Sequence, residues 1–325
     1  MRQRNLAGRS VGAIGYGAMV LEGYYGPIDE AESLSVLRAA LNAGATLIDT
    51  SDAYGNGHNE RLVGRALDGR TASALIATKF GIVYEADRPA TEFMTGWGFP
   101  LRLCGRPDYA RRCLDRSLAN LGVERIDLWQ LHFPDPALPI AETVGAMAGA
   151  VRAGKVAAIG LCNANAQQVR QAHAEHPIAS VQNEFSLWRR EDEVRLFPTL
   201  RELGIAYIPW SPLGSGFLAG TRSEPADGDF RRYNPRFQAG NLDANRARFA
   251  PLDHLARQAG ITPAQLALAW ILSRGDFLVP IPGSRSARHI EENIGAAAVE
   301  LPSSLLAELD SSLPTLDPQG GTLVT

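Results

Sequence analysis

Short apolar runs alternate with amphipathic stretches along the whole chain. The runs are rich in β-branched and aromatic residues, and the stretches between them are rich in alanine, leucine and arginine at helical spacing. The pattern predicts strands at 11–19, 46–52, 74–81, 126–133, 156–163, 180–186, 206–213 and 277–284. It predicts helices at 29–43, 58–69, 108–121, 140–153, 166–175, 192–203, 246–274 and 286–297. These repeated βα units favour a closed (β/α)8 TIM barrel, of the α/β class, with an open doubly wound sheet as the alternative.

Capping signals mark several of the predicted helix ends. Asp29 opens the first helix, and Thr262 stands before Pro263, a residue suited to the first helical turn. Glycine ends the stretches LNAG (41–44) and QAG (258–260), where a left-handed residue terminates a helix at little cost. The signals agree with alternating strands and helices.

Length and composition favour one large domain. The chain has 325 residues, 45% hydrophobic and 21% charged, and no compositional shift divides it. Since barrels of this size form single domains, one barrel domain over 1–325 is expected. The connections 85–107, after the third strand, and 214–245, after the seventh, are too long for turns. Both follow strand ends, where barrel enzymes build active sites, so they are expected to cover substrate and cofactor unless they are plain surface insertions.

Charge and cysteine content exclude several functions. A net charge of −3 and a pI near 6.1 leave no basic stripe for a nucleic acid. No apolar window is long enough to predict a membrane span, and the N-terminus lacks the apolar segment of a signal peptide. Cys104, Cys113 and Cys162 form no disulfide pattern and have no metal-ligand spacing. The sequence thus predicts a reduced, cytoplasmic protein without a metal site.

Four chemically active side chains fall at the ends of neighbouring predicted strands. Asp49 and Tyr54 lie at and just beyond the end of the second strand, Lys79 ends the third, and His132 ends the fourth. Lys79 is also unusual because the chain has only one other lysine, Lys155, and uses arginine at the remaining Lys/Arg positions. A lone ammonium or carboxylate is costly to bury, so Asp49 and Lys79 are expected to pair.

These groups together suggest carbonyl chemistry. An ammonium near a tyrosine hydroxyl favours the phenolate, so the pKa of Tyr54 is expected to fall toward a range useful for proton donation. A carbonyl oxygen could be held between Tyr54 and His132 while a hydride arrives at carbon. Taken singly, each residue also fits a structural role: a core ion pair, a buried tyrosine or a hydrogen-bonded histidine. Their combination on adjacent strand ends favours an active site.

Several stretches resemble the aldo-keto reductases, in order and over nearly the whole chain. They are IDTSDAYGNGHNERLVGRAL (48–67), ATKFG (77–81), LGVERIDLWQLHFPDP (121–136), VRAGKVAAIGLCN (151–163), VQNEFSLW (181–188), WSPLGSGFL (210–218) and IPGSRSARHIEENI (281–294). The resemblance implies reduction of aldehydes or ketones to alcohols by hydride transfer from NADPH, which becomes NADP+. It makes Tyr54 the general acid, tuned by Lys79 with the help of Asp49, and His132 the residue that orients the carbonyl. The pyridoxal-reductase and auxin-induced-like branch is the most similar in appearance.

The same resemblance implies which residues bind the cofactor. Asn163 and Gln182 would hold the nicotinamide carboxamide, and Trp210 would stack on the nicotinamide ring. The other implied contacts are Ser211, Leu213, Gly214, Gly216 and Leu218 at the pyrophosphate and Gly283, Ser284, Arg285, Arg288, Glu292 and Asn293 at the adenosine. Because arginine suits bidentate phosphate contact, the two arginines favour NADP over NAD. Two positions depart from the family pattern: Cys162 replaces a common serine, and Ser215 replaces a lysine frequent in some branches.

Two other functions are compatible with the same residues. A Schiff-base aldolase barrel also uses a strand-end lysine, although Lys79 beside Asp49 is expected to stay charged and to be a poor nucleophile. A regulatory subunit of the potassium-channel β-subunit type would keep the fold and the cofactor with little turnover. Aromatic residues near strand ends favour an apolar pocket for a small carbonyl substrate, although each equally fits packing within a loop: Tyr24, Tyr25, Trp97, Phe99, Phe133, Trp188 and Phe217. The sequence specifies neither the substrate nor an oligomeric state.

Overall fold

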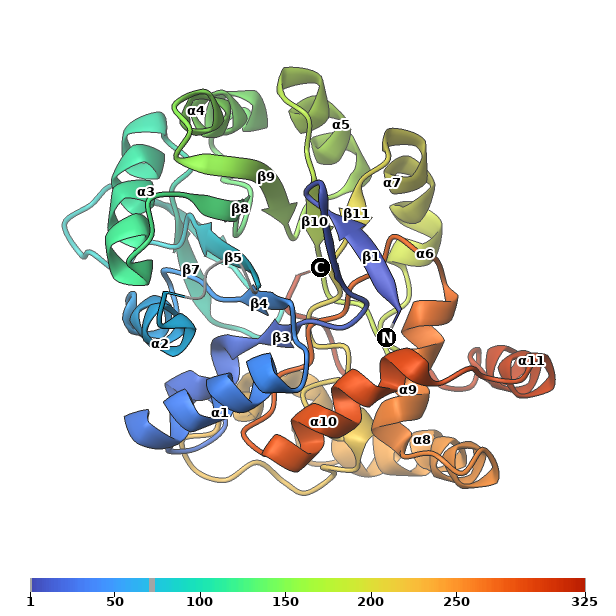
Figure 1. Cartoon of the computed structure of the whole chain (residues 1–325). Coiled ribbons are helices and arrows are strands. Elements are labelled where there is room, and N and C mark those ends of the chain that lie inside the picture. The colour runs from blue at the N-terminus through green and yellow to red at the C-terminus, as the bar shows by residue number, and fades with distance from the viewer. Residues whose placement is uncertain (1, 70–73, 325) are drawn as a thin grey trace.

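The centre of the molecule is a parallel β-sheet curled into a barrel (Figure 1). The structure, a computed structural model, describes residues 2–69 and 74–324. Within them, the sheet has the strand order β3–β4–β5–β8–β9–β10–β11. The strands are β3 (Tyr16–Gly17), β4 (Leu47–Asp49), β5 (Leu75–Phe80), β8 (Ile126–Leu131), β9 (Val156–Cys162), β10 (Ser180–Gln182) and β11 (Ala206–Tyr207). Neighbours in the sheet run parallel, as repeated βα units predict.

The eighth predicted strand joins the two edges of this sheet. At the β11 edge, the Tyr207 N–H donates to the Phe277 carbonyl at 2.8 Å. At the β3 edge, the Gly15 N–H donates to the Pro280 carbonyl at 2.9 Å. Prolines in the segment 277–282 have no N–H to donate, so the segment closes the ring through scattered bonds rather than a regular ladder. The predicted (β/α)8 barrel is thereby confirmed.

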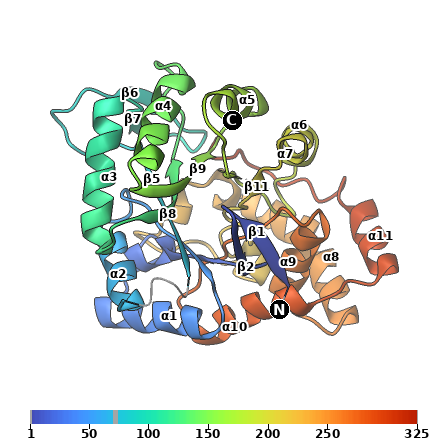
Figure 2. The same cartoon turned by 45° about the horizontal axis from the view of Figure 1, so that its top comes forward.

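Helices form the outer layer around the barrel (Figures 1 and 2). They are α1 (Glu30–Asn42), α2 (His58–Leu67), α3 (Pro107–Leu121), α4 (Ile140–Arg152), α5 (Ala166–Glu175), α6 (Asp192–Arg195), α7 (Phe197–Leu203), α8 (Asn241–Gln258), α9 (Pro263–Ser273), α10 (Ala287–Gly295) and α11 (Ser303–Ser312). The Asp29 side chain caps α1 by accepting from the Glu32 N–H at 2.7 Å, as its sequence signal predicts. Apolar faces of the helices pack against outward strand residues and form the main hydrophobic core.

Two predicted helices are each divided in the structure. The single helix predicted at 246–274 is wrong, because α8 ends and α9 begins anew at Thr262. The Thr262 hydroxyl accepts from the Gln265 N–H at 3.2 Å, which satisfies a donor that a new helix leaves open. The helix predicted at 192–203 consists of α6 and α7, and Pro198 stands in the first turn of α7. The helix α11 lies beyond the last predicted element.

The first predicted strand, 11–19, divides among three elements. Its beginning belongs to β2 (Arg9–Gly12), which pairs antiparallel with β1 (Gln3–Leu6), its middle includes β3, and its last two residues begin the 3-10 turn η1 (Ala18–Glu22). Ala7 and Gly8 connect the pair with φ of 53° and 75°, as a tight hairpin turn requires. The apolar residues of the hairpin face the amino ends of the barrel strands, and the hairpin closes that end of the barrel.

The two long connections carry short elements of their own. The connection 85–107 contains the antiparallel hairpin β6 (Thr91–Met94) and β7 (Pro100–Leu103). The connection 214–245 contains the 3-10 turns η3 (Phe217–Ala219), η4 (Phe230–Tyr233) and η5 (Pro235–Phe237). Residues of both connections line one cavity at the carboxyl ends of the strands. They therefore cover the site, as their position in the sequence predicts.

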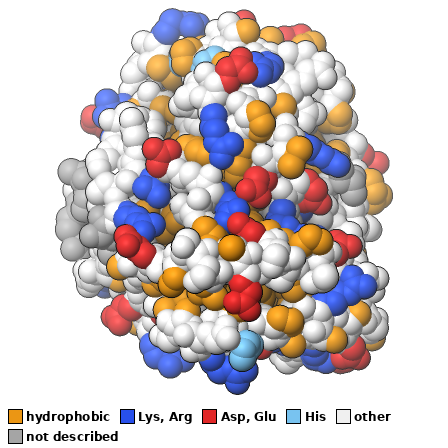
Figure 3. Space-filling model, turned by 90° about the vertical axis from the view of Figure 1, so that its right-hand side faces the viewer, with side chains coloured by type: hydrophobic (Ala, Val, Ile, Leu, Met, Phe, Trp, Pro, Cys, Tyr) orange, Lys and Arg blue, Asp and Glu red, His pale blue; other side chains and the backbone are white. Residues whose placement is uncertain are grey.

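Acidic and basic side chains are interspersed over the face of the molecule shown in Figure 3. Ion pairs also join helices, as between Arg274, which follows α9, and Asp310 of α11 at 3.1 Å. Among the described residues, no helix combines the length and apolar character needed to cross a membrane.

Candidate functional site

The carboxyl end of the barrel opens into a cavity of about 860 Å³. Strand ends supply its floor, and the connections after the third and seventh strands supply much of its wall. Three non-glycine residues with positive φ line it: Asn163 (55°), Ser211 (50°) and Ser215 (54°). Such backbone conformations are costly and collect at functional sites, which marks this cavity as the candidate active site.

Asp49 and Lys79 form a buried ion pair at the floor of the cavity. Asp49 ends β4 and Lys79 lies near the end of β5, and the parallel pairing of these strands brings the two side chains together. The Lys79 ammonium donates to the Asp49 carboxylate, to the Thr50 carbonyl at 2.9 Å and to the Tyr54 hydroxyl at 3.3 Å. The predicted pair is present, and it reaches the hydroxyl predicted to donate a proton.

The second carboxylate oxygen of Asp49 is held by two glutamine amides. Gln182 donates to Asp49 Oδ2 through Nε2 at 2.8 Å, and Gln130 donates to the same atom at 3.4 Å. Both glutamines are buried on neighbouring strands, β10 and β8. Sequence reasoning assigns Gln182 to the nicotinamide and overlooks Gln130, which lies within the stretch LWQLHF without a distinguishing signal.

Burial and the neighbouring charges together set the protonation of these groups. Burial would lower the pKa of Lys79, but Asp49 and then Tyr54 outweigh it, so the pKa lies above its ordinary value. The ammonium therefore stays charged, which makes it a poor nucleophile. Burial raises the pKa of Tyr54, and the Lys79 charge offsets this only in part. The expected fall of the tyrosine pKa is thus wrong, although Lys79 acts in the expected direction; Tyr54 keeps its proton and can donate it.

His132 follows β8 and lines the cavity beside Tyr54. The two rings meet edge to face with centroids 5.9 Å apart. His132 Nδ1 lies 3.2 Å from the Ser51 hydroxyl, a contact that the sequence did not suggest. Burial, followed by the Lys79 charge, holds the pKa of His132 well below its usual range. The imidazole is therefore neutral at neutral pH and carries one ring proton.

The predicted nicotinamide contacts form a connected group on the adjoining wall. Asn163 Nδ2 donates to the His132 carbonyl at 3.0 Å, and its Oδ1 accepts from Trp210 Nε1 at 3.2 Å. Cys162, directly before it, is buried and also lines the cavity. These hydrogen bonds fix the amide of Asn163 and the indole of Trp210 relative to each other.

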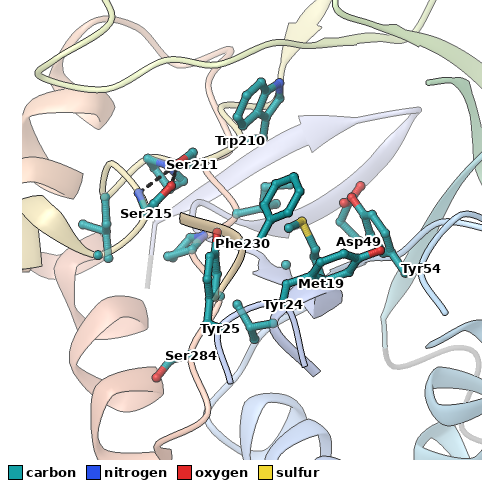
Figure 4. Close-up of a pocket in the computed structure, with 18 of the residues that line it drawn as sticks. Met19, Tyr24, Tyr25, Asp49, Tyr54, Trp210, Ser211, Ser215, Phe230 and Ser284 are labelled. Atoms are coloured by element: carbon teal, nitrogen blue, oxygen red, sulfur yellow. Dashed lines mark hydrogen bonds between the residues drawn. The ribbon is translucent and has the colours of Figure 1, made fainter. Parts of the chain in front are cut away.

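The predicted pyrophosphate loop follows Trp210 as a tight turn. The Ser215 N–H donates to the Ser211 hydroxyl at 3.0 Å (Figure 4). Ser211, Leu213 and Gly216 line the cavity. The other two predicted loop residues do not: Leu218 is buried in the main core, and a Cβ at Gly214 would stand 2.6 Å from the Trp188 ring. Their role is to let the turn pack closely against the barrel.

The predicted adenosine end lies at the start of α10. Gly283, Ser284, Arg285, Glu292 and Asn293 line the cavity, whereas Arg288 is exposed outside it. Arg285 donates to the carbonyls of Tyr25 and Gly26 at 3.0 Å each, so its guanidinium ties down the segment after β3. The first turn of α10 has no acidic residue, and its N-cap makes no side-chain hydrogen bond. That N-terminus is therefore suited to an anion.

Aromatic side chains enclose the part of the cavity nearest Tyr54. Five of the seven aromatic residues expected from the sequence line it: Tyr24, Tyr25, Trp97, Phe99 and Phe133. Trp188 and Phe217 do not; they stack on each other in the core. Sequence reasoning missed Phe230, which lies between Trp210 and Tyr24 in Figure 4. It packs on the rings of Tyr24, Trp97 and Phe99 at 5.6 Å each.

Arg231, next to Phe230, is a further cavity residue that the sequence did not single out. Its Nε donates to Asp229 at 3.0 Å, and its guanidinium lies 5.2 Å from the Tyr25 ring centre. The Phe230 N–H donates to the Tyr24 carbonyl at 2.7 Å. The connection 214–245 is thus fastened across the cavity to the segment after β3, and only its length signalled this function.

Comparison with known proteins agrees with this geometry. Residues 13–314 match the aldo/keto reductase family. The chain is 43% identical to the probable aldo-keto reductase 1 of Glycine max over 320 residues, which cover 97% of this chain and 89% of that protein.

Solved structures show the same architecture. The glycerol dehydrogenase of Gluconobacter oxydans superposes with a TM-score of 0.84 at 26% identity, covering 99% of both chains. An aldo-keto reductase of Klebsiella pneumoniae in complex with NADPH superposes with a TM-score of 0.71 at 25% identity, covering 100% of this chain and 99% of that one. The family match spans most of the barrel and includes the ends of β4, β5 and β8 that carry the buried ion pair. This chain belongs to the aldo/keto reductase family.

Proposed function

We propose that this protein, as one barrel domain over residues 1–325, reduces an aldehyde or ketone to the alcohol with NADPH, and that Tyr54 is the general acid. One observation carries the proposal: the buried ammonium of Lys79 contacts both the Asp49 carboxylate and the Tyr54 hydroxyl at the floor of the cavity. A charged donor at 3.3 Å stabilises the phenolate that Tyr54 becomes after it gives up its proton.

The side chains around Tyr54 fit the demands of carbonyl reduction. The chemistry that NADPH supplies is a hydride for the carbonyl carbon. The carbonyl oxygen then needs a proton and a place where its developing negative charge is stabilised, and Tyr54 and His132 line the same wall of the cavity. Lys79 and Asp49 stay buried beneath them and hold the tyrosine hydroxyl in place.

The described residues also fit a phosphorylated dinucleotide. The cavity runs from Tyr54 and Trp210 past the turn at Ser211 to the N-terminus of α10. That helix end is uncapped and has Arg288 in its first turn, which suits a phosphate on the adenosine side. The NADPH complex of the Klebsiella pneumoniae relative is a further argument for this cofactor. Under this proposal the cofactor contacts are those of Asn163, Trp210 and the residues after the eighth strand.

The decisive experiment measures NADPH oxidation over a panel of carbonyl compounds that includes pyridoxal, aromatic aldehydes and short dicarbonyls. We expect Tyr54→Phe to lower kcat by about 10²–10⁴-fold, the usual contribution of general acid catalysis. The affinity for NADPH, measured by quenching of tryptophan fluorescence, should be unchanged because only a proton donor is lost.

Tyr84→Phe is the matched control, because Tyr84 lines the same cavity but makes no contact with Lys79. It should keep its activity on small aldehydes. If Tyr54→Phe retained half of the wild-type kcat, Tyr54 would not be the acid. If the wild type bound NADPH and reduced no member of the panel, the reductase proposal would fail.

A further inference from the structure

The ring of His132 has one polar neighbour whose position decides which nitrogen carries the proton. Ser51 Oγ lies 3.2 Å from Nδ1. Within the described residues, His132 Nε2 has no hydrogen-bond partner, and the side chain lines the cavity. The rings of Phe133 and Tyr54 pack on the imidazole with centroids at 5.3 Å and 5.9 Å, and neither described side chain forms a hydrogen bond with it.

Ser51 is itself held in place by the backbone. Its Oγ accepts from the Ala53 N–H at 3.1 Å, which leaves the hydroxyl with one proton to give. Two acceptors compete for that proton: His132 Nδ1 at 3.2 Å and Asp52 Oδ1 at 3.5 Å. The shorter contact is the one to the imidazole. The contact to Asp52 is long for an O–H···O hydrogen bond, and the other carboxylate oxygen of Asp52, Oδ2, accepts from Arg116 at 3.2 Å.

The two arrangements have opposite consequences for the cavity. When the Ser51 hydroxyl donates to Nδ1, the neutral imidazole must carry its proton on Nε2, where it can donate into the cavity. When the hydroxyl turns to Asp52, Nδ1–H donates to Ser51 and Nε2 becomes an acceptor. Only the first arrangement gives a substrate carbonyl a second hydrogen-bond donor beside Tyr54.

We propose that Ser51 is a positioning residue that holds His132 in the tautomer with its proton on Nε2. The inference rests on the proposed function, because that proton matters only if His132 orients a carbonyl oxygen. Ser51 acts wholly through the imidazole: it is fully buried and does not line the cavity. The chain thus selects the tautomer with a residue two positions after Asp49, on the same strand end that carries the ion pair.

A spectroscopic test addresses the tautomer without any turnover. In protein labelled with ¹⁵N-histidine, the protonated and unprotonated ring nitrogens have well separated resonances, and His132→Gln identifies the signals of His132 among the six histidines. We expect the wild type to show a protonated Nε2, and Ser51→Ala to show a mixture or a protonated Nδ1. A wild-type His132 protonated on Nδ1, or signals unchanged in Ser51→Ala, would overturn the inference.

A kinetic test separates positioning from a general structural effect. With the fastest aldehyde of the panel, Ser51→Ala should lower kcat by about tenfold, the scale of one misplaced hydrogen bond, with little change in NADPH affinity. In a His132→Gln background the same substitution should change kcat little, because the residue through which Ser51 acts is gone. An equal loss in both backgrounds would show a structural role and contradict the inference.

Ser117→Ala is the matched control, because Ser117 is also fully buried, lies on α3, and its hydroxyl has no hydrogen-bond partner among the described residues. It should leave both the His132 signals and kcat unchanged; a loss equal to that of Ser51→Ala would assign the effect to removal of any buried hydroxyl. A wild type without reductase activity would refute the proposed function alone, since the tautomer of His132 is still decided by its spectrum.

Discussion

Gln182 donates a hydrogen bond of 2.8 Å to the same Asp49 carboxylate that pairs with Lys79. A residue that the family resemblance assigns to the cofactor therefore also supports the buried ion pair. Both carboxylate oxygens of Asp49 are engaged, one by the ammonium and one by amides, which is how a buried charge avoids an unsatisfied lone pair.

Gln182→Leu should therefore destabilise the protein even without cofactor. A hydrogen bond to a buried charged group is worth about 1.5–3 kcal/mol, and leucine leaves Asp49 Oδ2 with only the longer contact from Gln130. Urea denaturation of wild type and variant gives the difference in free energy of unfolding. Gln130→Leu, which removes two 3.4 Å contacts, one to Asp49 and one accepted from the Ser180 hydroxyl, should cost less because both are long. Equal stability of Gln182→Leu and wild type would mean that Gln182 serves the cofactor alone.

The two lysines of the chain provide a matched pair of substitutions. Lys79→Met leaves a carboxylate buried without its partner and should lower the free energy of unfolding by about 3–5 kcal/mol. It should also lower kcat by about 10²-fold or more, because the Tyr54 phenolate loses the nearby positive charge. Lys155→Met, which removes an exposed pair with Asp115, should change stability by less than about 1 kcal/mol and leave kcat intact. If Lys79→Met and Lys155→Met lost kcat to a similar extent, the loss would not be specific to Lys79, and Lys79 would have no role in the mechanism.

Much of the site was predictable because β-strand geometry places it. Once Asp49 and Lys79 are assigned to the ends of adjacent parallel strands, their pairing follows from the cost of burying either charge alone. The direction in which the pKa of Tyr54 shifts was not predictable, since it depends on how deeply the hydroxyl is buried. Burial raises this pKa by more than the charge of Lys79 lowers it. The contact between Ser51 and His132 depends on side-chain placement across two strands, which no local pattern encodes.

The wrong predictions of a helix boundary and of cavity residues have similar physical causes. Thr262 and Pro263 signalled a new helix, but continuous helical periodicity across 246–274 concealed the break between α8 and α9. Trp188 and Phe217 have the same apolar character as Trp97 and Phe99, and only the packed structure separates core from cavity. Phe230 reaches the cavity through a connection whose path depends on long-range contacts with Tyr24.

Arg285 and Arg288 should affect the cofactor in different ways. Arg288 is exposed in the first turn of α10, where its guanidinium lies 3.1 Å from His289 Nε2, and under the proposed function it binds a phosphate on the adenosine ribose. Arg288→Ala should weaken NADPH by roughly tenfold to a hundredfold and hardly change NADH, because one charge-assisted contact is lost. Arg285 instead binds the carbonyls of the segment at 25–27, so Arg285→Ala should weaken both cofactors alike.

Fluorescence titration with NADPH and with NADH gives the dissociation constants of both variants relative to the wild type. Equal losses of NADPH and NADH in Arg288→Ala, or a wild type that prefers NADH, would overturn the assignment of NADP. A selective loss of NADPH in Arg285→Ala would move the phosphate contact to that residue.

Asp52 should make the stability of the fold depend on pH. Burial, together with the charge of Glu60, raises the pKa of Asp52 from its ordinary value of 3.8 to about 7, against the opposing effect of Arg116. A carboxyl whose pKa is higher in the folded than in the unfolded protein binds its proton more tightly when folded. Its contribution to stability is therefore present below pH 4 and is lost as the pH rises to about 7.

Asp52→Asn removes this titration, so the free energy of unfolding of the variant minus that of the wild type should increase as the pH is raised from 4 to 7. The increase should be on the order of a few kcal/mol, since one pKa unit corresponds to about 1.4 kcal/mol. Urea denaturation across this range measures it, and taking the difference cancels the carboxyl groups that both proteins share. Asp227→Asn, at a 98% exposed side chain whose pair with Arg232 is screened by solvent, should give a much smaller change. A flat difference for Asp52→Asn would mean that Arg116 offsets the cost of burial completely and that Asp52 stays ionised in the folded protein down to acidic pH.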